Sequence, residues 1–179
     1  LRMSRGLGDV YKRQMVASLT TGKKKYADVE SEIQQLLKST NTLHDKLLDQ
    51  VRADAEGFQP LSRAYAIPRE DPTRAAVLQS AAETACTAPL EIMALCAAAL
   101  SAAGRLAEIG SRLAVSDAGC AAAILRGALE AAALNVLVNT KTMTDRSAAD
   151  HLNARCFALL DQGRTDGERI FCAVRDQLV

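Results

Sequence analysis

The chain has 179 residues, of which 49% are hydrophobic and only 3% aromatic, and it contains no tryptophan. This length suits one domain with a sizeable core. The formal net charge of +1 excludes a global electrostatic field that would favour nucleic acid or a membrane surface as partner. An alanine-rich chain with few aromatic residues favours closely packed helices over sheets.

The five cysteines are scattered, with no C-x-x-C pair and no histidine at ligand spacing. This pattern predicts free thiols in a reducing cytoplasm and no metal site. No secretory signal is visible, and the apolar stretch 120–138 is interrupted by Arg126 and Glu130. We therefore expect a cytoplasmic protein that does not span a membrane.

The first fourteen residues differ from the rest, with two glycines, four basic residues and no helical periodicity. They resemble translated sequencing-adapter read-through, so residues 1–14 are expected to be non-native or disordered and residues 15–179 to form the single domain. A long helix is predicted from about Asp28 to Ala66, after Gly22 and before Pro68. It would be on the order of 60 Å long. The predicted fold is all-α, an elongated bundle of long antiparallel helices.

Further helix boundaries follow from caps and helix breakers. Asp71-Pro72 is predicted to start a helix, with a kink or break at Pro89 and an end at Gly110. Ser116-Asp117 is predicted to cap the next helix, which extends to about Thr140. The last helix is predicted to start at Asp145 or Ser147 and to break locally at Gly163 and Gly167. Residues four apart form a small-residue face for helix packing: Gly119, Ala123, Gly127, Ala131, Asn135 and Asn139.

One carboxylate interrupts the apolar spacing of the first long helix. Continuing the spacing from Val51 leads to Asp54 and then to Phe58. A buried carboxylate is costly unless it is paired or protonated. Either the helix rotates so that Ala55 takes the buried position, or Asp54 faces inward for a functional reason.

Other polar residues accompany Asp54 on apolar helices. Ser116 and Asp117 have a structural explanation as a helix cap, and Asn135 and Asn139 could bridge helices through their amides. Together with Asp54 these residues indicate a polar pocket between helices, where bundles commonly bind ligands.

Several short motifs, in order and with ordinary spacing over about residues 15–179, resemble the cyclodeaminase/cyclohydrolase family. They are Gly22–Glu30, Asp54-Ala55 with Phe58, Ile67-Pro68, Pro89-Leu90, Val115–Asp117 and Ala133–Lys141. The family includes formiminotetrahydrofolate cyclodeaminase and methenyltetrahydrofolate cyclohydrolase. The resemblance implies an all-α homodimeric enzyme that acts on the one-carbon unit bridging N5 and N10 of tetrahydrofolate, with no cofactor beyond that substrate.

The resemblance also implies roles for individual residues. Asp54 matches the family's catalytic acid and is suited to general acid–base chemistry. The implied folate-binding residues are Ser116, Asp117, Asn135, Asn139, Lys141 and Lys24, with the lysines meeting the acidic glutamyl tail.

Three functions stay open. The first is cyclodeaminase activity, which converts 5-formiminotetrahydrofolate to 5,10-methenyltetrahydrofolate and ammonia. The second is cyclohydrolase activity, which opens 5,10-methenyltetrahydrofolate to 10-formyltetrahydrofolate. The third is a non-catalytic helical dimer or folate-binding module.

Two departures from the family pattern bear on activity. No glycine-rich segment precedes Met15, and Ser111 and Leu113 replace two amides of the pattern. We therefore expect a domain that lacks its first helix and has an altered folate-binding loop, which would weaken or abolish turnover by this chain alone.

Overall fold

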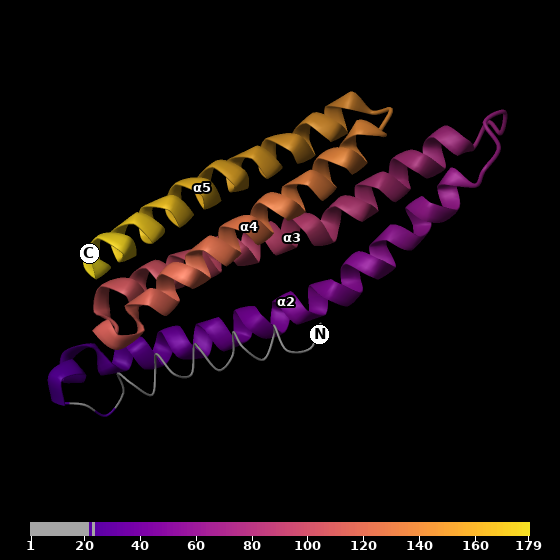
Figure 1. Cartoon of the computed structure of the whole chain (residues 1–179). Coiled ribbons are helices and arrows are strands. Elements are labelled where there is room, and N and C mark those ends of the chain that lie inside the picture. The colour runs from indigo at the N-terminus through magenta and orange to yellow at the C-terminus, as the bar shows by residue number, and fades with distance from the viewer. Residues whose placement is uncertain (1–21, 23) are drawn as a thin grey trace. The chain divides into compact units, whose positions relative to one another are not determined.

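The computed structural model describes Gly22 and residues 24–179. In this part of the chain the elements are, in order, η1 (Lys24–Val29), α2 (Glu30–Tyr65), α3 (Arg74–Ile109), η2 (Arg112–Ala114), α4 (Val115–Lys141) and α5 (Arg146–Leu178). Figure 1 shows the long helices α2, α3, α4 and α5. The prediction of an all-α fold is confirmed. The prediction for residues 1–14 falls outside the described residues.

The chain divides into two compact units, and each of the four long helices contributes one stretch to each unit. Unit 1 comprises the described residues up to His44, Ala98–Arg126 and Gly163–Val179, and unit 2 comprises Asp45–Ala97 and Gly127–Gln162. Within unit 2, short connections join α2 to α3 and α4 to α5, so the helices of each pair run antiparallel (Figure 1).

The helix ends show which capping predictions were correct. The Asp145 carboxylate accepts a hydrogen bond from the Ala148 N–H at 3.0 Å, so α5 starts where predicted. The Asp71 carboxylate accepts hydrogen bonds from the N–H and hydroxyl of Thr73 at 2.8 and 2.6 Å. It thereby forms a turn just ahead of α3, which begins at Arg74, slightly later than predicted.

The prediction that Ser116-Asp117 caps a helix is wrong in position. Helix α4 begins at Val115, directly after η2, so both residues lie inside its first turn. The short η2 helix already turns the chain toward α4, which removes the need for a cap at Ser116. Asp117 still places a negative charge near the positive end of the helix dipole.

Helices α3 and α5 are both continuous. The break predicted in α5 is therefore wrong, as is the alternative of a break at Pro89, while the alternative of a kink at Pro89 stays a prediction. In α5, Gly167 allows close packing and does not break the helix. A Cβ atom on Gly167 would lie 2.9 Å from the Cβ of Arg126 on α4, closer than real Cβ atoms approach. Gly163 and Gly167 are both buried.

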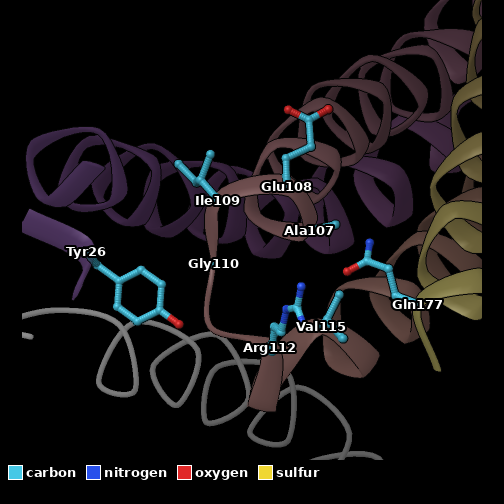
Figure 2. A pocket seen from close by; sticks show the side chains of 8 residues that line it. All are labelled: Tyr26, Ala107, Glu108, Ile109, Gly110, Arg112, Val115 and Gln177. Carbon is cyan, nitrogen blue, oxygen red and sulfur yellow. The ribbon is translucent and has the colours of Figure 1, made fainter. Parts of the chain in front are cut away.

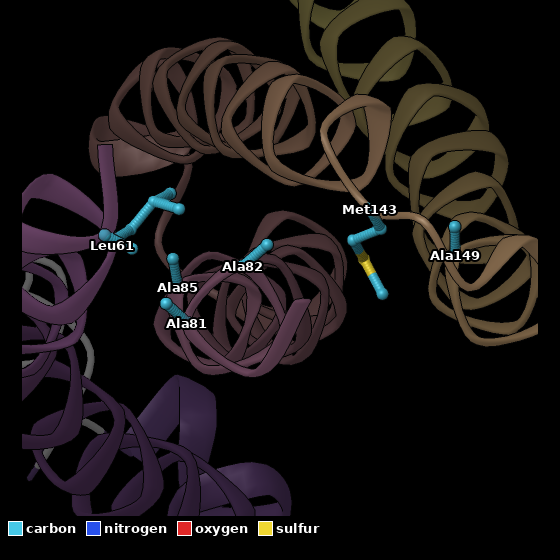
Figure 3. Packing of buried hydrophobic residues seen from close by; sticks show 7 residues of the cluster. Leu61, Ala81, Ala82, Ala85, Met143 and Ala149 are labelled. Carbon is cyan, nitrogen blue, oxygen red and sulfur yellow. The ribbon is translucent and has the colours of Figure 1, made fainter. Parts of the chain in front are cut away.

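Alanine dominates the core of unit 2, shown in Figure 3. Side chains from α2, α3, α5 and the α4–α5 connection form it, namely Leu61, Ala64, Ala81, Ala82, Ala85, Met143 and Ala149. Small side chains bring helix axes close together, and the larger Leu61 and Met143 fill the remaining space.

In unit 1 the core residues are Leu100, Val115, Ala122, Ile170 and Val174. A Cβ atom on Gly119 would lie 2.8 Å from Cγ1 of Val174, so α4 and α5 approach closely at this point. The predicted small-residue face is buried only at its ends, at Gly119 and Asn139. Its middle residues Ala123, Gly127, Ala131 and Asn135 are exposed.

Two helical segments are long and apolar enough, by length and composition alone, to cross a membrane: Arg74–Ile109 and Arg112–Lys141. For the first, 67% of the most apolar window is buried inside the protein, as in the core helix of a bundle, and for the second 28% is buried.

Two glycine substitutions on α4 should have opposite effects on stability. Gly119→Ala should lower the free energy of unfolding by about 1–2 kcal/mol, because the branched Val174 side chain cannot yield easily. Gly127→Ala should raise it by up to about 1 kcal/mol, because nothing lies within 4 Å of the added methyl group and alanine favours helix. Chemical denaturation of both variants measures this. Equal effects of the same sign would contradict the packing at Gly119.

Candidate functional site

Asp54 lies on the inward-facing side of α2 in unit 2. Leu61 and Ala64 are buried, and Asp54 and Gly57 precede them at helical spacing and are half-buried. The apolar spacing in the sequence predicts that Val51 and Phe58 are buried on the same face as Asp54, but their side chains are 70% and 52% exposed. The alternative in which Ala55 takes the buried position is wrong, because Ala55 is exposed. Asp54 therefore shares a face with the core residues of α2.

The Asp54 carboxylate is not engaged in a hydrogen bond or an ion pair with the described residues. Three residues further on, a Cβ atom on Gly57 would lie 3.6 Å from the carbonyl oxygen of Thr84 on α3. Helix α2 therefore runs close to the backbone of α3, one helical turn from Asp54. A half-buried carboxylate without a protein partner is available for exchange of a proton with a ligand.

Asn139 of α4 packs against the next residue of α3. Its Nδ2 donates a hydrogen bond to the carbonyl oxygen of Ala85 at 3.1 Å, and the side chain is buried. The interpretation that Asn139 bridges helices through its amide is thus supported. Consecutive residues of a helix lie about 100° apart around its axis, so α2 and α4 approach the same turn of α3 from two sides.

The levels of Asp54 and Asn135 along α3 follow from these two contacts. Within unit 2, α2 and α4 both run opposite to α3, so they run in the same direction. Asp54 precedes Gly57, and Asn135 precedes Asn139, by one helical turn. Both residues therefore lie about 5 Å further along α3, at the level of Pro89. Asn135 is exposed, as is Lys141 at the end of α4.

The remaining predicted residues belong to unit 1. Ser116 is exposed and Asp117 half-buried in the first turn of α4. Lys24 is the first residue of η1. The structure thus brings Asp54, Asn135 and Asn139 to neighbouring levels of unit 2 and places Ser116, Asp117 and Lys24 on unit 1.

Unit 1 contains a pocket of about 530 Å³ at the junction of α3 and α4, shown in Figure 2. Its lining residues come from η1, α3, η2, α4 and α5 and from the connection after α3: Tyr26, Ala107, Glu108, Ile109, Gly110, Arg112, Val115 and Gln177. The Glu108 carboxylate is paired with Arg105 at 2.9 Å. Arg112 is exposed and pairs with no carboxylate among the described residues, so it is the available cation of this lining. The sequence alone did not mark Arg112, although it is the basic residue of the α3–α4 connection.

Three of the five cysteines are unsuited to nucleophilic chemistry. Cys86, Cys96 and Cys156 are buried. Burial raises the pKa of the Cys86 and Cys96 thiols to about 11 each, and it raises the pKa of the Cys156 thiol as well. A thiol that stays protonated near neutral pH is a poor nucleophile. In the described part of the chain, His, Cys, Asp and Glu side chains form no cluster of three or more that could hold a metal ion.

An all-α protein with an available carboxylate and amides on its helix faces is, by class, a helical bundle that can house a small ligand. Comparison with known proteins makes the class specific. The chain belongs to the formiminotransferase-cyclodeaminase family, whose model matches residues 13–158.

Individual relatives agree with this assignment. The chain is 35% identical over 168 residues to methenyltetrahydrofolate cyclohydrolase of Methylorubrum extorquens, covering 92% of this chain and 81% of that protein. It is 29% identical over 155 residues to formimidoyltransferase-cyclodeaminase of Sus scrofa, covering 84% of this chain but only 29% of that longer protein. The crystal structure of formiminotetrahydrofolate cyclodeaminase from Thermotoga maritima matches with a TM-score of 0.79 and 25% identity, covering 97% of this chain and 82% of that chain.

The buried thiols predict a loss of stability at high pH. In the unfolded chain they ionise near their ordinary pKa of about 8.5, whereas the native Cys86 and Cys96 stay protonated up to about 11. The unfolded state therefore binds fewer protons above pH ~9, and the free energy of unfolding should fall as the pH rises toward the raised pKa. Urea denaturation at about pH 8 and about pH 10, on either side of the unfolded pKa, measures this. The Cys86→Ala/Cys96→Ala variant should show a smaller fall, and an unchanged fall would contradict the prediction.

Proposed function

We propose that this protein is a folate-dependent one-carbon enzyme that uses Asp54 as its general acid and base. The carrying observation is the half-buried Asp54 carboxylate on the inward face of α2, without a partner among the described residues, in a member of this family. The first candidate reaction is hydrolysis of 5,10-methenyltetrahydrofolate to 10-formyltetrahydrofolate. The higher identity to the Methylorubrum cyclohydrolase, over most of both chains, favours it over the cyclodeaminase reaction, the first of the three functions that the sequence left open.

In the hydrolysis, the Asp54 carboxylate takes a proton from water as the water oxygen adds to the bridging carbon. The adduct then collapses: the carbon–N5 bond breaks, N5 receives the proton held by Asp54, and the hydroxyl proton passes to solvent. The formyl group remains on N10. A single carboxyl group that alternates between base and acid suffices for both transfers.

The second candidate is the cyclodeaminase reaction, favoured by the match to the Thermotoga maritima structure. Here N10 adds to the formimino carbon, and the proton that N10 loses passes to the imino nitrogen, which becomes an amino group. The Asp54 carboxyl, protonated from solvent, then gives this amino group a second proton, the carbon–nitrogen bond breaks, and ammonia leaves as the methenyl bridge forms. The carboxyl group at Asp54 therefore has the same task in both reactions. The two reactions differ at the bridging carbon, because water adds to it in the hydrolysis and ammonia leaves it in the cyclodeaminase reaction.

Other groups of the protein suit the remaining parts of a folate. The exposed Asn135 amide, one turn from Asn139, offers both a donor and an acceptor to a pterin ring. Lys24 and Lys141 stay candidates for the carboxylates of the glutamyl tail. Ser116-Asp117 remains a candidate for polar folate contacts in the first turn of α4.

Substitution of Asp54 tests the proposed chemistry. Asp54→Asn should lower kcat by about 10²–10⁴-fold, because an amide cannot relay the proton. The assay follows methenyl absorbance with 5,10-methenyltetrahydrofolate and, separately, with 5-formiminotetrahydrofolate. Asp49→Asn is the matched control, since Asp49 is an exposed aspartate on the same helix, and it should leave turnover unchanged.

The outcomes separate the candidates. Turnover of the methenyl substrate in preference to the formimino substrate supports the cyclohydrolase, and the reverse supports the cyclodeaminase. Tight folate binding without turnover of either would leave a folate-binding module, and equal rates for Asp54→Asn and wild type would remove Asp54 from the mechanism.

We also propose that the protein forms a homodimer in the cytoplasm, with the exposed face of α4 in unit 2 contributing to the interface. This face carries Leu134 and Val138, which are 68% and 58% exposed. Neighbouring exposed apolar side chains on one helix are typical of interaction surfaces.

A charge on this face should disrupt the dimer. Leu134→Glu should convert the protein to a monomer, because an unpaired carboxylate would be buried in the interface. Leu113→Glu, at a similarly exposed position outside α4, should not. Sedimentation equilibrium measures both, and a dimer that persists in Leu134→Glu would place the interface elsewhere.

A further inference from the structure

Pro89 creates a defect in the hydrogen bonding of α3. Proline lacks the backbone N–H that an interior helical residue donates to the carbonyl four residues earlier. At Pro89 that acceptor is the carbonyl of Ala85. Both residues are buried, so water cannot readily replace the missing donor. A buried carbonyl without a partner is destabilising. Nevertheless α3 continues through Pro89 without a break.

Asn139 provides the replacement donor. Its Nδ2 lies 3.1 Å from the Ala85 oxygen, the same atom that loses its partner at Pro89. The side chain is buried, so the bond is shielded from water. No other side-chain donor to the Ala85 oxygen occurs among the described residues. The chain therefore repairs a defect in α3 with a side chain from α4.

The same turn of α4 is held from a second direction. Thr140, the next residue, donates its hydroxyl to Oδ1 of Asn153 on α5 at 2.7 Å. Asn139 and Thr140 thus bind α4 to both neighbours, and these contacts fix the height and rotation of α4 in unit 2. Asn135, one turn earlier, is positioned by the same contacts.

We propose that Asn139 is a positioning residue that substitutes for the N–H absent at Pro89, and that its amide does not bind folate. In this assignment the Pro89–Ala85–Asn139 arrangement sets the level of α4 along α3, and thereby keeps Asn135 at the same level as the turn of α2 that carries Asp54. The effect on catalysis rests on the proposed function, but the pairing of Asn139 with Pro89 does not.

A double-mutant cycle tests the pairing directly. The four proteins are the wild type, Asn139→Leu, Pro89→Ala and the double variant. Leucine has a similar size to asparagine but no donor. The Pro89→Ala substitution restores a backbone N–H that can donate to the Ala85 oxygen. Asn139→Leu should lower Tm by roughly 3–10 °C in the wild type and by less than half as much in the Pro89→Ala background.

Asn135→Leu in the same two backgrounds is the control, since this exposed amide lies on the same helix one turn away. Its effect on Tm should not depend on residue 89. If the Asn139→Leu single variant does not fold, a cooperative thermal unfolding transition in the double variant shows that Pro89→Ala restores folding, which equally supports the pairing. Asn139→Ser, which keeps a shorter polar side chain, is then measured in both backgrounds.

Kinetics distinguish positioning from binding. If Asn139 positions α4, Asn139→Leu should lower kcat, and Pro89→Ala should restore it to within about threefold of the Pro89→Ala single variant with KM unchanged. An equal rise in KM in both backgrounds would instead show that the amide binds folate. An equal loss of Tm in both backgrounds would overturn the pairing. Absence of turnover in the wild type would count against the proposed function alone, because the Tm cycle still decides the pairing.

Discussion

Close helix–helix approach through alanine and glycine is the constraint on which the rest of this structure depends. In unit 2 the α3 contribution to the core is Ala81, Ala82 and Ala85, and at Gly57 α2 runs close to the backbone of α3. Side chains this small leave the backbone carbonyls of α3 within reach of neighbouring helices. A carbonyl that has lost its helical partner at Pro89 can then be satisfied from α4. The polar contacts of unit 2 therefore depend on the close packing of its helices.

Much of the fold could be predicted from residues with a local mechanism. Asp145 caps α5, and Pro68 and Gly110 follow the ends of α2 and α3, because caps and helix breakers act within a few residues. The predictions that failed concern positions where contacts with residues distant in the sequence determine whether the helix continues. Pro89, Gly163 and Gly167 suggest breaks to a local analysis, but Asn139 compensates the first and close packing against α4 explains the glycine at 167.

The candidate site shows the same division. The charge of Asp54 interrupts an apolar pattern and so indicates a special position, but that pattern runs through Val51 and Phe58, which are exposed. Spacing alone cannot distinguish an apolar stripe that packs on the bundle from one left on the surface. Asn139 was recognised as a polar residue among alanines, yet its partner lies 54 positions away. No sequence pattern indicates a site at Arg112, since only the folded chain brings it together with distant residues in one pocket.

A one-carbon enzyme needs a group that can hold and return a proton at the bridging carbon, and Asp54 is the group that this chain offers on the inward face of α2. The most direct measurement is a crystal structure of the protein with 5-formyltetrahydrofolate, a stable analogue of the folate substrates. We expect the one-carbon group to lie within hydrogen-bond distance of the Asp54 carboxylate. A bound folate whose N5 and N10 face other residues and make no contact with Asp54 would contradict the proposed catalytic role.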